Sequence, residues 1–281
     1  MGELPADARL GAIRLRAGDV DRLTRFYEES IGLRVLERDD AITSLGVDGT
    51  PLVELEPAPD APPRPPQTTG LFHLALLVPA RADLAQALRR VAATDWHLSG
   101  ASDHLVSEAL YLSDPEGNGI ELYRDRPRDE WQVVDGVLRM DTLPLDLGSL
   151  LSDSDEAHAD TGMPSGTTLG HVHLQVSDLA AAEGFWVDGL GLDVTVRGYP
   201  GALFTSAGGY HHHVGLNTWA GTGAPPPPAG ARGLDRFELV LPDRAAVSAA
   251  AERLAAVAPI DVVEDGVLAS DPSGNAVLVR S

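Results

Sequence analysis

The chain contains an internal repeat. The stretch LGAIRLRAGDVDRLTRFYEESIGLRV, which begins at Leu10, aligns without gaps with LGHVHLQVSDLAAAEGFWVDGLGLDV, which begins at Leu169. The matched positions include Asp19 with Asp178. Self-similarity of this length indicates copies of one supersecondary unit. The chain therefore consists of two related halves.

A second match divides each half again. HLALLVPARADLAQAL from His73 aligns with RFELVLPDRAAVSAAA from Arg236. Both segments lead to a DPxGN turn and an apolar run, SDPEGNGIELYR at 113–124 and SDPSGNAVLVRS at 270–281. Each copy combines a short alternating strand, an amphipathic helical pattern and further β-rich runs. We expect four modules of order β-α-β-β-β.

Pro-rich stretches, APDAPPRPPQ and GAPPPPAGARG, separate the two modules of each half. An acidic segment at 127–166 joins the halves, and its composition predicts a partly ordered connector. The predicted domains are an N-terminal half at 1–126, this connector, and a C-terminal half at 167–281. The four predicted modules are 8–58, 70–126, 167–220 and 233–281.

The composition limits which residues can bind a metal and which partners the chain is expected to have. The chain has no cysteine, which excludes disulfides and thiolate metal sites and leaves histidine and carboxylate as metal ligands. With 42 acidic and 21 basic residues the formal charge is −21. Such a charge repels phosphate backbones and anionic lipid, so neither nucleic acid nor a membrane is an expected partner.

The hydropathy pattern predicts a folded cytoplasmic protein. Hydrophobic residues make up 43% of the 281 positions, enough to fill a sizeable core. No apolar run approaches the length of a membrane span, and the start, MGELPADARLG, lacks the basic and apolar regions of a signal peptide.

Four β-α-β-β-β modules, a strand opening LGHVHLQVSDL and DPxGN turns followed by IEL resemble the vicinal oxygen chelate superfamily. That superfamily includes glyoxalases, bleomycin-resistance proteins and extradiol ring-cleaving dioxygenases, and the sequence is most similar to bacterial catechol-2,3-dioxygenase-like two-domain proteins. The resemblance implies an α+β fold in which four βαβββ modules pair into two open mixed β-barrels. It also implies a metal inside a barrel, held by the first and last strands of the modules.

The positions that correspond to these ligands differ between the modules. The first-strand residues are Ala12, His73, His171 and Arg236, and the last-strand residues of modules 1, 2 and 4 are Glu54, Glu121 and Leu278. The resemblance thus implies His73, Glu121 and His171 as ligands, a set that leaves three positions open on Fe(II). Mn(II), Zn(II) and Ni(II) are the alternatives. A site built from modules 2 and 3 implies that these two pair, as do 1 and 4, instead of 1 with 2 and 3 with 4.

Each candidate ligand also has an ordinary structural interpretation. A lone histidine such as His73, opening an apolar strand, is more often a core or rim residue than a ligand. His173 shares the face of His171 by strand alternation, so either is a candidate, and the alignment favours His171. Glu121 lies in the apolar run GIELY, where an inward carboxylate needs a partner. Their matched repeat positions together favour a metal.

The segment ASDHLVSEALYLSDPEGNGIELY, at 101–123, resembles a signature of extradiol dioxygenases. Only Ser102 departs from the pattern. The resemblance implies that His104 and Tyr111 donate hydrogen bonds to the substrate and the reacting oxygen. Considered alone, Tyr111 could be a core aromatic and His104 a surface residue. The residues that satisfy the spacing are His104, Leu110, Tyr111, Asp114, Pro115, Gly117 and Glu121.

Three of the nine histidines are consecutive, in YHHHVGLNTW at 210–219. We expect them on the late strand of module 3. Resemblance to an Arg-His-His-x-Val-Ala-Leu run implies that His212 is the acid–base residue, a role that suits imidazole near neutral pH. In a regular strand His211 and His213 point to the opposite face, and either is the alternative fourth ligand.

The resemblance implies an Fe(II)-dependent extradiol dioxygenase whose partners are a catechol-type aromatic diol and O2. One alternative is a glyoxalase- or isomerase-like enzyme with four protein ligands, the fourth being His211 or His213. Another is a non-catalytic protein that binds an aromatic antibiotic, although such binders generally lack a metal triad. Superfamily members often form dimers or larger assemblies, so a homo-oligomer is compatible with the resemblance.

Overall fold

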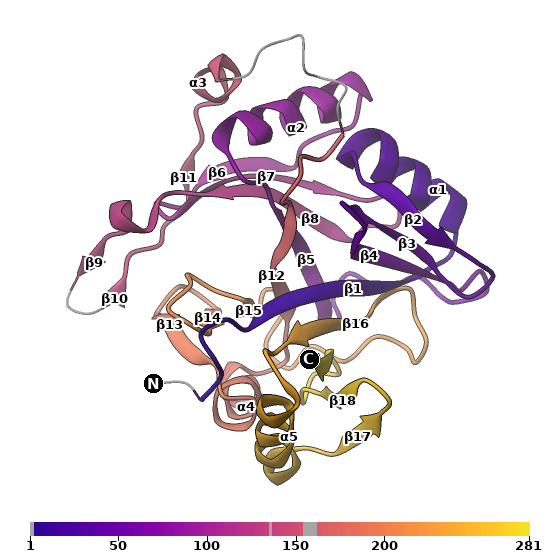
Figure 1. Cartoon of the computed structure of the whole chain (residues 1–281), viewed down its shortest axis with the longest axis vertical. Coiled ribbons are helices and arrows are strands. Elements are labelled where there is room, and N and C mark those ends of the chain that lie inside the picture. Colours follow the sequence, from indigo (N-terminus) through magenta and orange to yellow (C-terminus); the bar gives the residue numbers. More distant parts are fainter. Residues whose placement is uncertain (1–2, 135–136, 154–161) are drawn as a thin grey trace. The chain divides into compact units, whose positions relative to one another are not determined.

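The computed structural model describes residues 3–134, 137–153 and 162–281 (Figure 1). Each predicted module has one helix and four strands in the expected order, which confirms the predicted fold class. Module 1 contains β1 (Arg9–Ala17), α1 (Val20–Phe26), a π-helical turn (Tyr27–Ile31), β2 (Arg34–Arg38), β3 (Thr43–Val47) and β4 (Thr50–Pro57). Module 2 contains β5 (Gly70–Leu77), α2 (Arg81–Ala93), β6 (Gly100–Asp103), β7 (Ser107–Ser113) and β8 (Gly119–Asp125).

Modules 3 and 4 repeat this order. Module 3 contains β12 (Thr168–Gln175), α4 (Leu179–Glu183), a π-helical turn (Gly184–Gly189), β13 (Asp193–Arg197), β14 (Ala202–Ser206) and β15 (Val214–Asn217). Module 4 contains β16 (Gly233–Val240), α5 (Arg244–Val257), β17 (Ile260–Val263), β18 (Gly266–Ser270) and β19 (Ala276–Arg280).

Much of the predicted connector has secondary structure. Its elements are a 3-10 turn (Arg128–Glu130), β9 (Val133–Val134), β10 (Val137–Leu138), β11 (Leu143–Pro144) and α3 (Leu147–Ser152). β11 pairs with β6, with Leu143 opposite Asp103. Residues 135–136 and 154–161 of the predicted connector lie outside the described residues.

Within the described ranges the strands form two large sheets and the small β9–β10 hairpin. The strand order of the first sheet is β17-β18-β19-β16-β1-β4-β3-β2, and that of the second is β11-β6-β7-β8-β5-β12-β15-β14-β13. Modules 1 and 4 therefore contribute to one sheet and modules 2 and 3 to the other, as the ligand positions predicted.

The chain also divides into two compact units. Unit 1 comprises Met1–Leu15, Ala61–Phe72 and Gly170–Ser281, and unit 2 comprises Arg16–Asp60 and His73–Leu169. The boundaries fall inside β1, β5 and β12, so each of these strands contributes residues to both units.

The repeat pattern has a physical basis in helix capping. Asp19 accepts a hydrogen bond from the Arg22 backbone N–H, and Asp178 does the same for Ala181, so each carboxylate caps a helix. Gly32 and Gly191 follow the π-helical turns at φ 91° and 98°, a conformation that favours glycine.

The DPxGN turns are organised by their aspartates. The Oδ1 atom of Asp114 accepts hydrogen bonds from the backbone N–H groups of Glu116 and Asn118. Asp271 makes the corresponding bonds to Ser273 and Asn275. These local bonds hold the chain in a tight turn before the last strand of modules 2 and 4. The motif is therefore structural in both copies.

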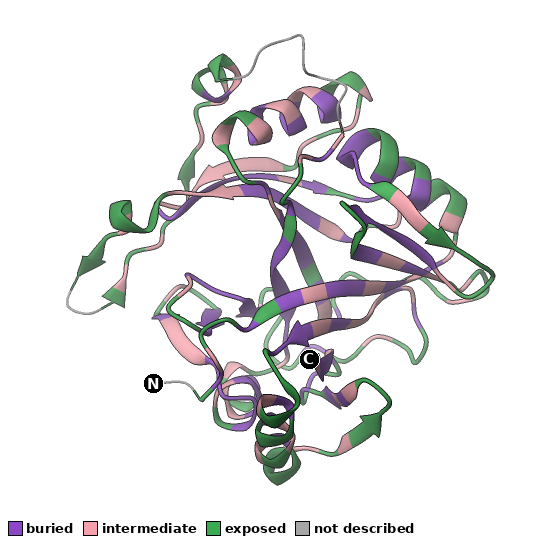
Figure 2. Ribbon diagram, in the orientation of Figure 1, coloured by how far each residue is buried: buried purple, intermediate pink, exposed green. Residues whose placement is uncertain are grey.

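Strand alternation separates an apolar from a polar face. On β5 and β8 the side chains of Leu74, Leu76, Ile120 and Leu122 are fully buried, and α2 packs against β8. Figure 2 shows strands that are mostly buried, whereas the helices carry both buried and exposed residues. The alternate residues on β5 and β8 are therefore available for a site.

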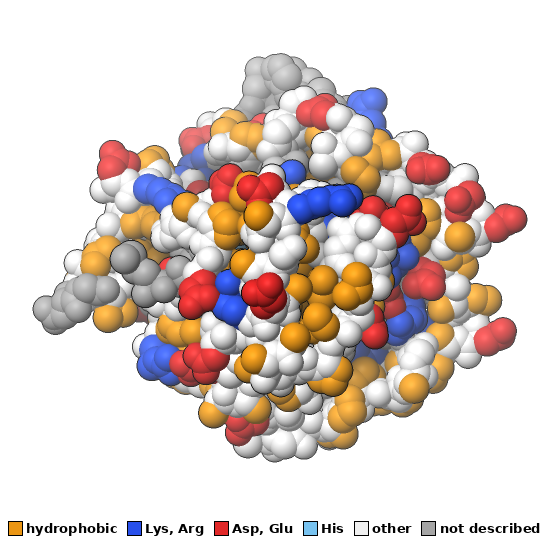
Figure 3. Space-filling view, turned by 60° about the horizontal axis from the view of Figure 1, so that its bottom comes forward, with side chains coloured by type: hydrophobic (Ala, Val, Ile, Leu, Met, Phe, Trp, Pro, Cys, Tyr) orange, Lys and Arg blue, Asp and Glu red, His pale blue; other side chains and the backbone are white. Residues whose placement is uncertain are grey.

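Acidic side chains are scattered over the face drawn in Figure 3, with basic side chains among them. Among the helices that the structure describes, none is long and apolar enough to cross a membrane.

Candidate metal centre

Two of the predicted ligands lie on adjacent parallel strands of unit 2. On β5 and β8, His73 is in register with Gly119, and Ala75 is in register with Glu121. Register partners and alternate residues share a face, so both side chains project from the same side of the sheet. Nε2 of His73 lies 3.0 Å from Oε2 of Glu121. The exposed fractions are 6% for His73 and 3% for Glu121, so bulk water hardly reaches the pair.

Small residues beside the pair leave room for these polar groups. Ala75 and Ala109 are fully buried, and Tyr111 packs against their cluster on the same face. Tyr111 on β7 is directly opposite Glu121 on β8. Larger side chains at the alanine positions would fill the space around the carboxylate. The local sequence thus places polar groups beside small buried side chains on this face of the sheet.

The separation of His73 and Glu121 fits a shared metal ion. Two ligand atoms that are each about 2.1 Å from one ion and about 90° apart lie about 3.0 Å from each other. A neutral imidazole and a carboxylate are also ligands that Fe(II), Mn(II) and Zn(II) accept. A buried carboxylate requires such a partner, because an unpaired charge is costly to remove from water.

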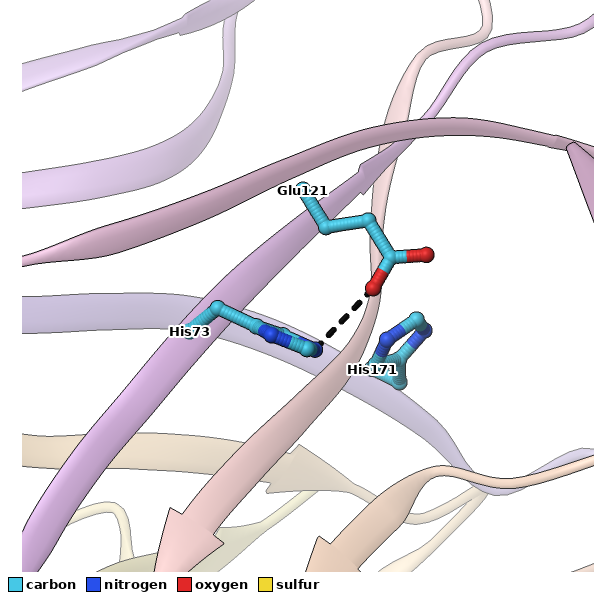
Figure 4. A group of neighbouring side chains, drawn as sticks. All are labelled: His73, Glu121 and His171. Atoms are coloured by element: carbon cyan, nitrogen blue, oxygen red, sulfur yellow. Dashed lines mark ion pairs between the residues drawn. The ribbon is translucent and has the colours of Figure 1, made fainter. Parts of the chain in front are cut away.

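The third predicted ligand, His171, lies on β12 in unit 1 and is 1% exposed. Within the residues that the structure describes, one group of three histidine or acidic side chains could hold a metal ion. It consists of His73, Glu121 and His171, whose ligand atoms lie within 4.8 Å of one another. Figure 4 shows these three side chains, with a dashed line for the His73–Glu121 pair.

His104 and Tyr111 are joined by a hydrogen bond, with 2.7 Å between His104 Nε2 and the Tyr111 hydroxyl oxygen. The other ring nitrogen of His104, Nδ1, lies 2.7 Å from the backbone oxygen of Asp141. The ring centroids of Tyr111 and His73 are 5.7 Å apart. Unit 2 therefore brings His104, Tyr111 and the His73–Glu121 pair together.

Sequence reasoning missed the contribution of Asp141. This residue belongs to the predicted connector, and β11 begins two residues after it. Pairing of β11 with β6 brings the segment beside His104, which directly follows β6. No short motif could show this contact, because it joins residues far apart in the sequence.

The expected position of the histidine triplet on a strand was wrong. β15 begins at Val214, and the three histidines precede it. The alternation predicted for His211 and His212 therefore does not apply, and their Nδ1 atoms lie 2.7 Å apart. Gly208 and Gly209, at φ 62° and 66°, end the extended backbone upstream.

Each histidine of the triplet has a different environment. The ring centroid of His212 lies 4.1 Å from that of His171, and that of His211 lies 6.0 Å from it. Nδ1 of His213 accepts a hydrogen bond from the Ala207 backbone N–H. Among the described residues, neither His211 nor His213 belongs to the group of three potential metal ligands. Of the His211 and His212 rings, that of His212 lies nearer to His171.

Comparison with known families identifies the fold. Residues 9–122 and 168–278 match the Glyoxalase/Bleomycin resistance protein/Dioxygenase superfamily. The chain belongs to this superfamily. Its resemblance to the vicinal oxygen chelate proteins is thereby confirmed.

Within the superfamily, the chain is 42% identical over 284 residues to the catechol-2,3-dioxygenase of Bacillus subtilis strain 168, covering 99% of both chains. Two solved structures share the superfamily fold at low sequence identity. A Bacillus subtilis strain 168 protein has a TM-score of 0.66 and 13% identity, covering 97% of this chain and 84% of the other. Glyoxalase I from Zea mays has a TM-score of 0.61 and 16% identity, covering 98% and 92%.

Proposed function

We propose that the chain is an extradiol ring-cleaving dioxygenase that uses Fe(II) and O2 to open a catechol-type aromatic diol. The observation that carries the proposal is the cross-strand pair of Tyr111 and Glu121, with His104 hydrogen-bonded to the Tyr111 hydroxyl. Ring cleavage requires hydrogen-bond donors beside the metal. The 42% identity to a catechol-2,3-dioxygenase supports the same activity.

In this proposal His73, Glu121 and His171 hold the metal. When bound, Fe(II) would supply a centre at which the diol and O2 exchange electrons. The low exposure of the three side chains keeps bulk water away from the reacting groups. Mn(II), Zn(II) and Ni(II) remain the alternative ions.

His212 is the proposed acid–base residue. It accepts the proton of a catechol hydroxyl and returns a proton to the ring-opened product. His171, the proposed ligand, lies next to it, with 4.1 Å between the ring centroids. The Tyr111 hydroxyl, which donates a hydrogen bond to Nε2 of His104, turns in the reaction to donate to the reacting oxygen, and His104 positions it.

The overall reaction inserts both atoms of O2 into the substrate. The carbon–carbon bond that breaks lies beside the two hydroxyl-bearing carbons and not between them, and the product is a semialdehyde. A glyoxalase-like reaction consumes no O2, and an antibiotic-binding protein leaves the ring intact. Oxygen consumption therefore separates the dioxygenase from the other two functions.

The experiment is anaerobic loading with Fe(II), followed by catechol and air-saturated buffer. An oxygen electrode and absorbance of the yellow ring-fission product should show one O2 consumed per catechol. Iron bound without oxygen uptake for any catechol tried would contradict the proposal. Parallel loading with Mn(II), Zn(II) and Ni(II) identifies the active ion.

The ligand assignment has a matched control within the repeat. Glu121→Gln keeps the size of the side chain but removes its charge, so the variant should lose most of its bound iron and its activity. Glu54 is the corresponding residue of module 1, and Glu54→Gln should retain both. Equal iron content in the two variants, measured by a colorimetric ferrous assay, would remove Glu121 from the ligand set.

A further inference from the structure

A row of polar side chains continues along β12 beyond His171, within unit 1. His173 and Gln175 follow at alternate positions and therefore share its face. In the parallel register with β15, His173 is opposite Gly215 and Gln175 is opposite Asn217. A Cβ atom on Gly215 would lie 3.0 Å from the His173 ring, so the glycine makes room for that ring.

Arg64 reaches this row from the Pro-rich segment before β5. Its Nη1 donates hydrogen bonds to Oε1 of Gln175 at 3.0 Å and to the backbone oxygen of Thr69 at 3.3 Å. Both acceptors are uncharged. Among the residues that the structure describes, no carboxylate forms an ion pair with Arg64, although the chain has 42 acidic and 21 basic residues.

The guanidinium of Arg64 is partly removed from water. Burial lowers the pKa of Arg64 below its ordinary value. A cation that is desolvated without a counter-charge is unfavourable, and an anion beside it would offset this cost. The planar guanidinium also suits the two oxygens of a carboxylate.

Asn217 adds a second hydrogen-bond donor. Its side chain is fully buried, and Oδ1 accepts a hydrogen bond from the Trp219 backbone N–H at 3.0 Å. Its Nδ2 has no hydrogen-bond partner in the described part of the chain. Buried amide nitrogens almost always have an acceptor, so this atom has capacity for one.

Three aromatic rings stand beside the polar row. The centroids of Phe72, His173 and Trp219 lie 5.1 to 5.3 Å from one another. Phe72 is 37% exposed and Trp219 is 45% exposed, whereas His173 is 4% exposed. The cluster therefore extends from solvent to the buried row, and its rings can contact the ring of an aromatic ligand.

We infer that Arg64, Gln175 and Asn217 form a subsite for an anionic substituent, so that the preferred substrate is a catechol carrying a carboxylate on a short side chain. This inference rests on the proposed function for the ring chemistry. Gln175 lies four residues beyond His171, about 13 Å along the strand at about 3.3 Å per residue. A catechol whose ring lies beside His173 and whose carboxylate points toward Arg64 fits within that distance.

The test compares 3,4-dihydroxyphenylacetate with its neutral amide on the Fe(II)-loaded protein. Kd is measured anaerobically by difference absorbance, and kcat/KM is measured with O2. The acid should be preferred by about 10- to 100-fold, the range for a hydrogen bond to a charged group. A ratio near one in the unmodified protein would overturn the inference.

Variants assign the preference to this subsite. Arg64→Gln should bring the acid-to-amide ratio close to one, and Arg64→Lys should restore part of it. Asn217→Asp keeps the acceptor for Trp219 but replaces the donor with a negative charge, and should lower the ratio as well. The matched control is Arg197→Gln in the same unit, because Arg197 already pairs with Glu183 at 2.6 Å.

The possible failures are distinguishable. An unchanged ratio in Arg64→Gln would overturn the subsite even if both catechols are cleaved. If the acid binds more tightly than the amide without O2, and this difference in Kd depends on Arg64, the subsite is supported. If no oxygen uptake follows in air, the same result contradicts the dioxygenase. Absence of binding by either catechol would contradict both.

Discussion

The hydroxyl of Tyr111 donates a hydrogen bond to Nε2 of His104, with 2.7 Å between the two atoms. This direction follows from the other side of the imidazole, where Nδ1 lies 2.7 Å from the Asp141 backbone oxygen. A carbonyl oxygen only accepts, so Nδ1 carries the hydrogen, and Nε2 of a neutral ring is left as the acceptor. The connector thus sets the tautomer of His104 and the orientation of Tyr111.

Tyr111→Phe should slow turnover without releasing the metal. The substitution removes the only donor that Tyr111 offers, while the ring still packs against Ala75 and Ala109. We expect kcat to fall about 10- to 100-fold at unchanged iron content, because the variant lacks the hydroxyl that turns from His104 to donate to a developing charge. Stopped-flow oxygen consumption and a ferrous assay measure the two quantities.

The control for this variant is Tyr27→Phe in the same unit. The Tyr27 hydroxyl donates to Oδ2 of Asp114 at 3.3 Å, in a fully buried structural contact. Its removal should lower the free energy of unfolding by about 1 kcal/mol and change kcat less than about threefold. If Tyr27→Phe slowed turnover as strongly as Tyr111→Phe, the effect would come from stability instead of proton donation.

His212→Asn should keep the metal and lose activity. His212 is proposed to move the substrate proton, a contribution typically of 10²- to 10⁴-fold, so kcat should fall by about that factor. His213→Asn is the comparison, because His213 is used in a hydrogen bond with the Ala207 backbone. It should affect kcat less than about tenfold. Loss of iron from His212→Asn would instead make His212 a ligand.

The repeated features could be predicted from the sequence because they follow local rules. Asp19 and Asp178 match because each caps a helix, and Gly32 and Gly191 match because each adopts a positive φ. Once the modules were aligned, strand register placed His73 and Glu121 side by side. In regular strands the positions of side chains can therefore be inferred from the sequence.

The remaining features depend on irregular backbone or on distant segments. The histidine triplet precedes β15, so alternation failed for His211 and His212. Asp141 reaches His104 from the connector, and Arg64 reaches Gln175 from a Pro-rich segment. Neither segment shows periodicity that predicts where its side chains lie, so these contacts emerge only from the folded chain.

Asp114 should make an unusual contribution to the pH dependence of stability. Burial raises its pKa above the ordinary carboxyl value of 3.8, although Asn118 and backbone donors act in the opposite direction. The contribution from a raised pKa is fully present below the unfolded value and is lost as pH rises through the folded value. Acidification from neutral pH should therefore increase the contribution of Asp114 to the free energy of unfolding.

Urea unfolding of Asp114→Asn isolates this contribution. At pH 7 the variant should be less stable by about 1 kcal/mol, since Asn118 Nδ2 and the Tyr27 hydroxyl lose an acceptor. The difference from the unmodified protein should grow as pH falls toward the ordinary carboxyl value of 3.8. Asp39→Asn should show the opposite trend, but only as pH falls below the ordinary carboxyl value of 3.8, because backbone hydrogen bonds from Ile42 and Ala41 lower the pKa of Asp39. Parallel trends would refute the assignment.

Metal removal should lower the thermal stability of the protein. An ion that binds only the folded chain stabilises it by about 2.7 kcal/mol at a concentration 100-fold above Kd, which corresponds to a rise of roughly 5 to 10 °C in Tm. Chelation by a ferrous chelator should reverse this rise, and Fe(II) should restore it. Glu121→Gln should abolish the response because it lacks a charged ligand, whereas Glu54→Gln should retain it. A response of equal size in both variants would show that the stabilising ion binds elsewhere, because Glu121 lies 3.0 Å from His73 in the proposed site.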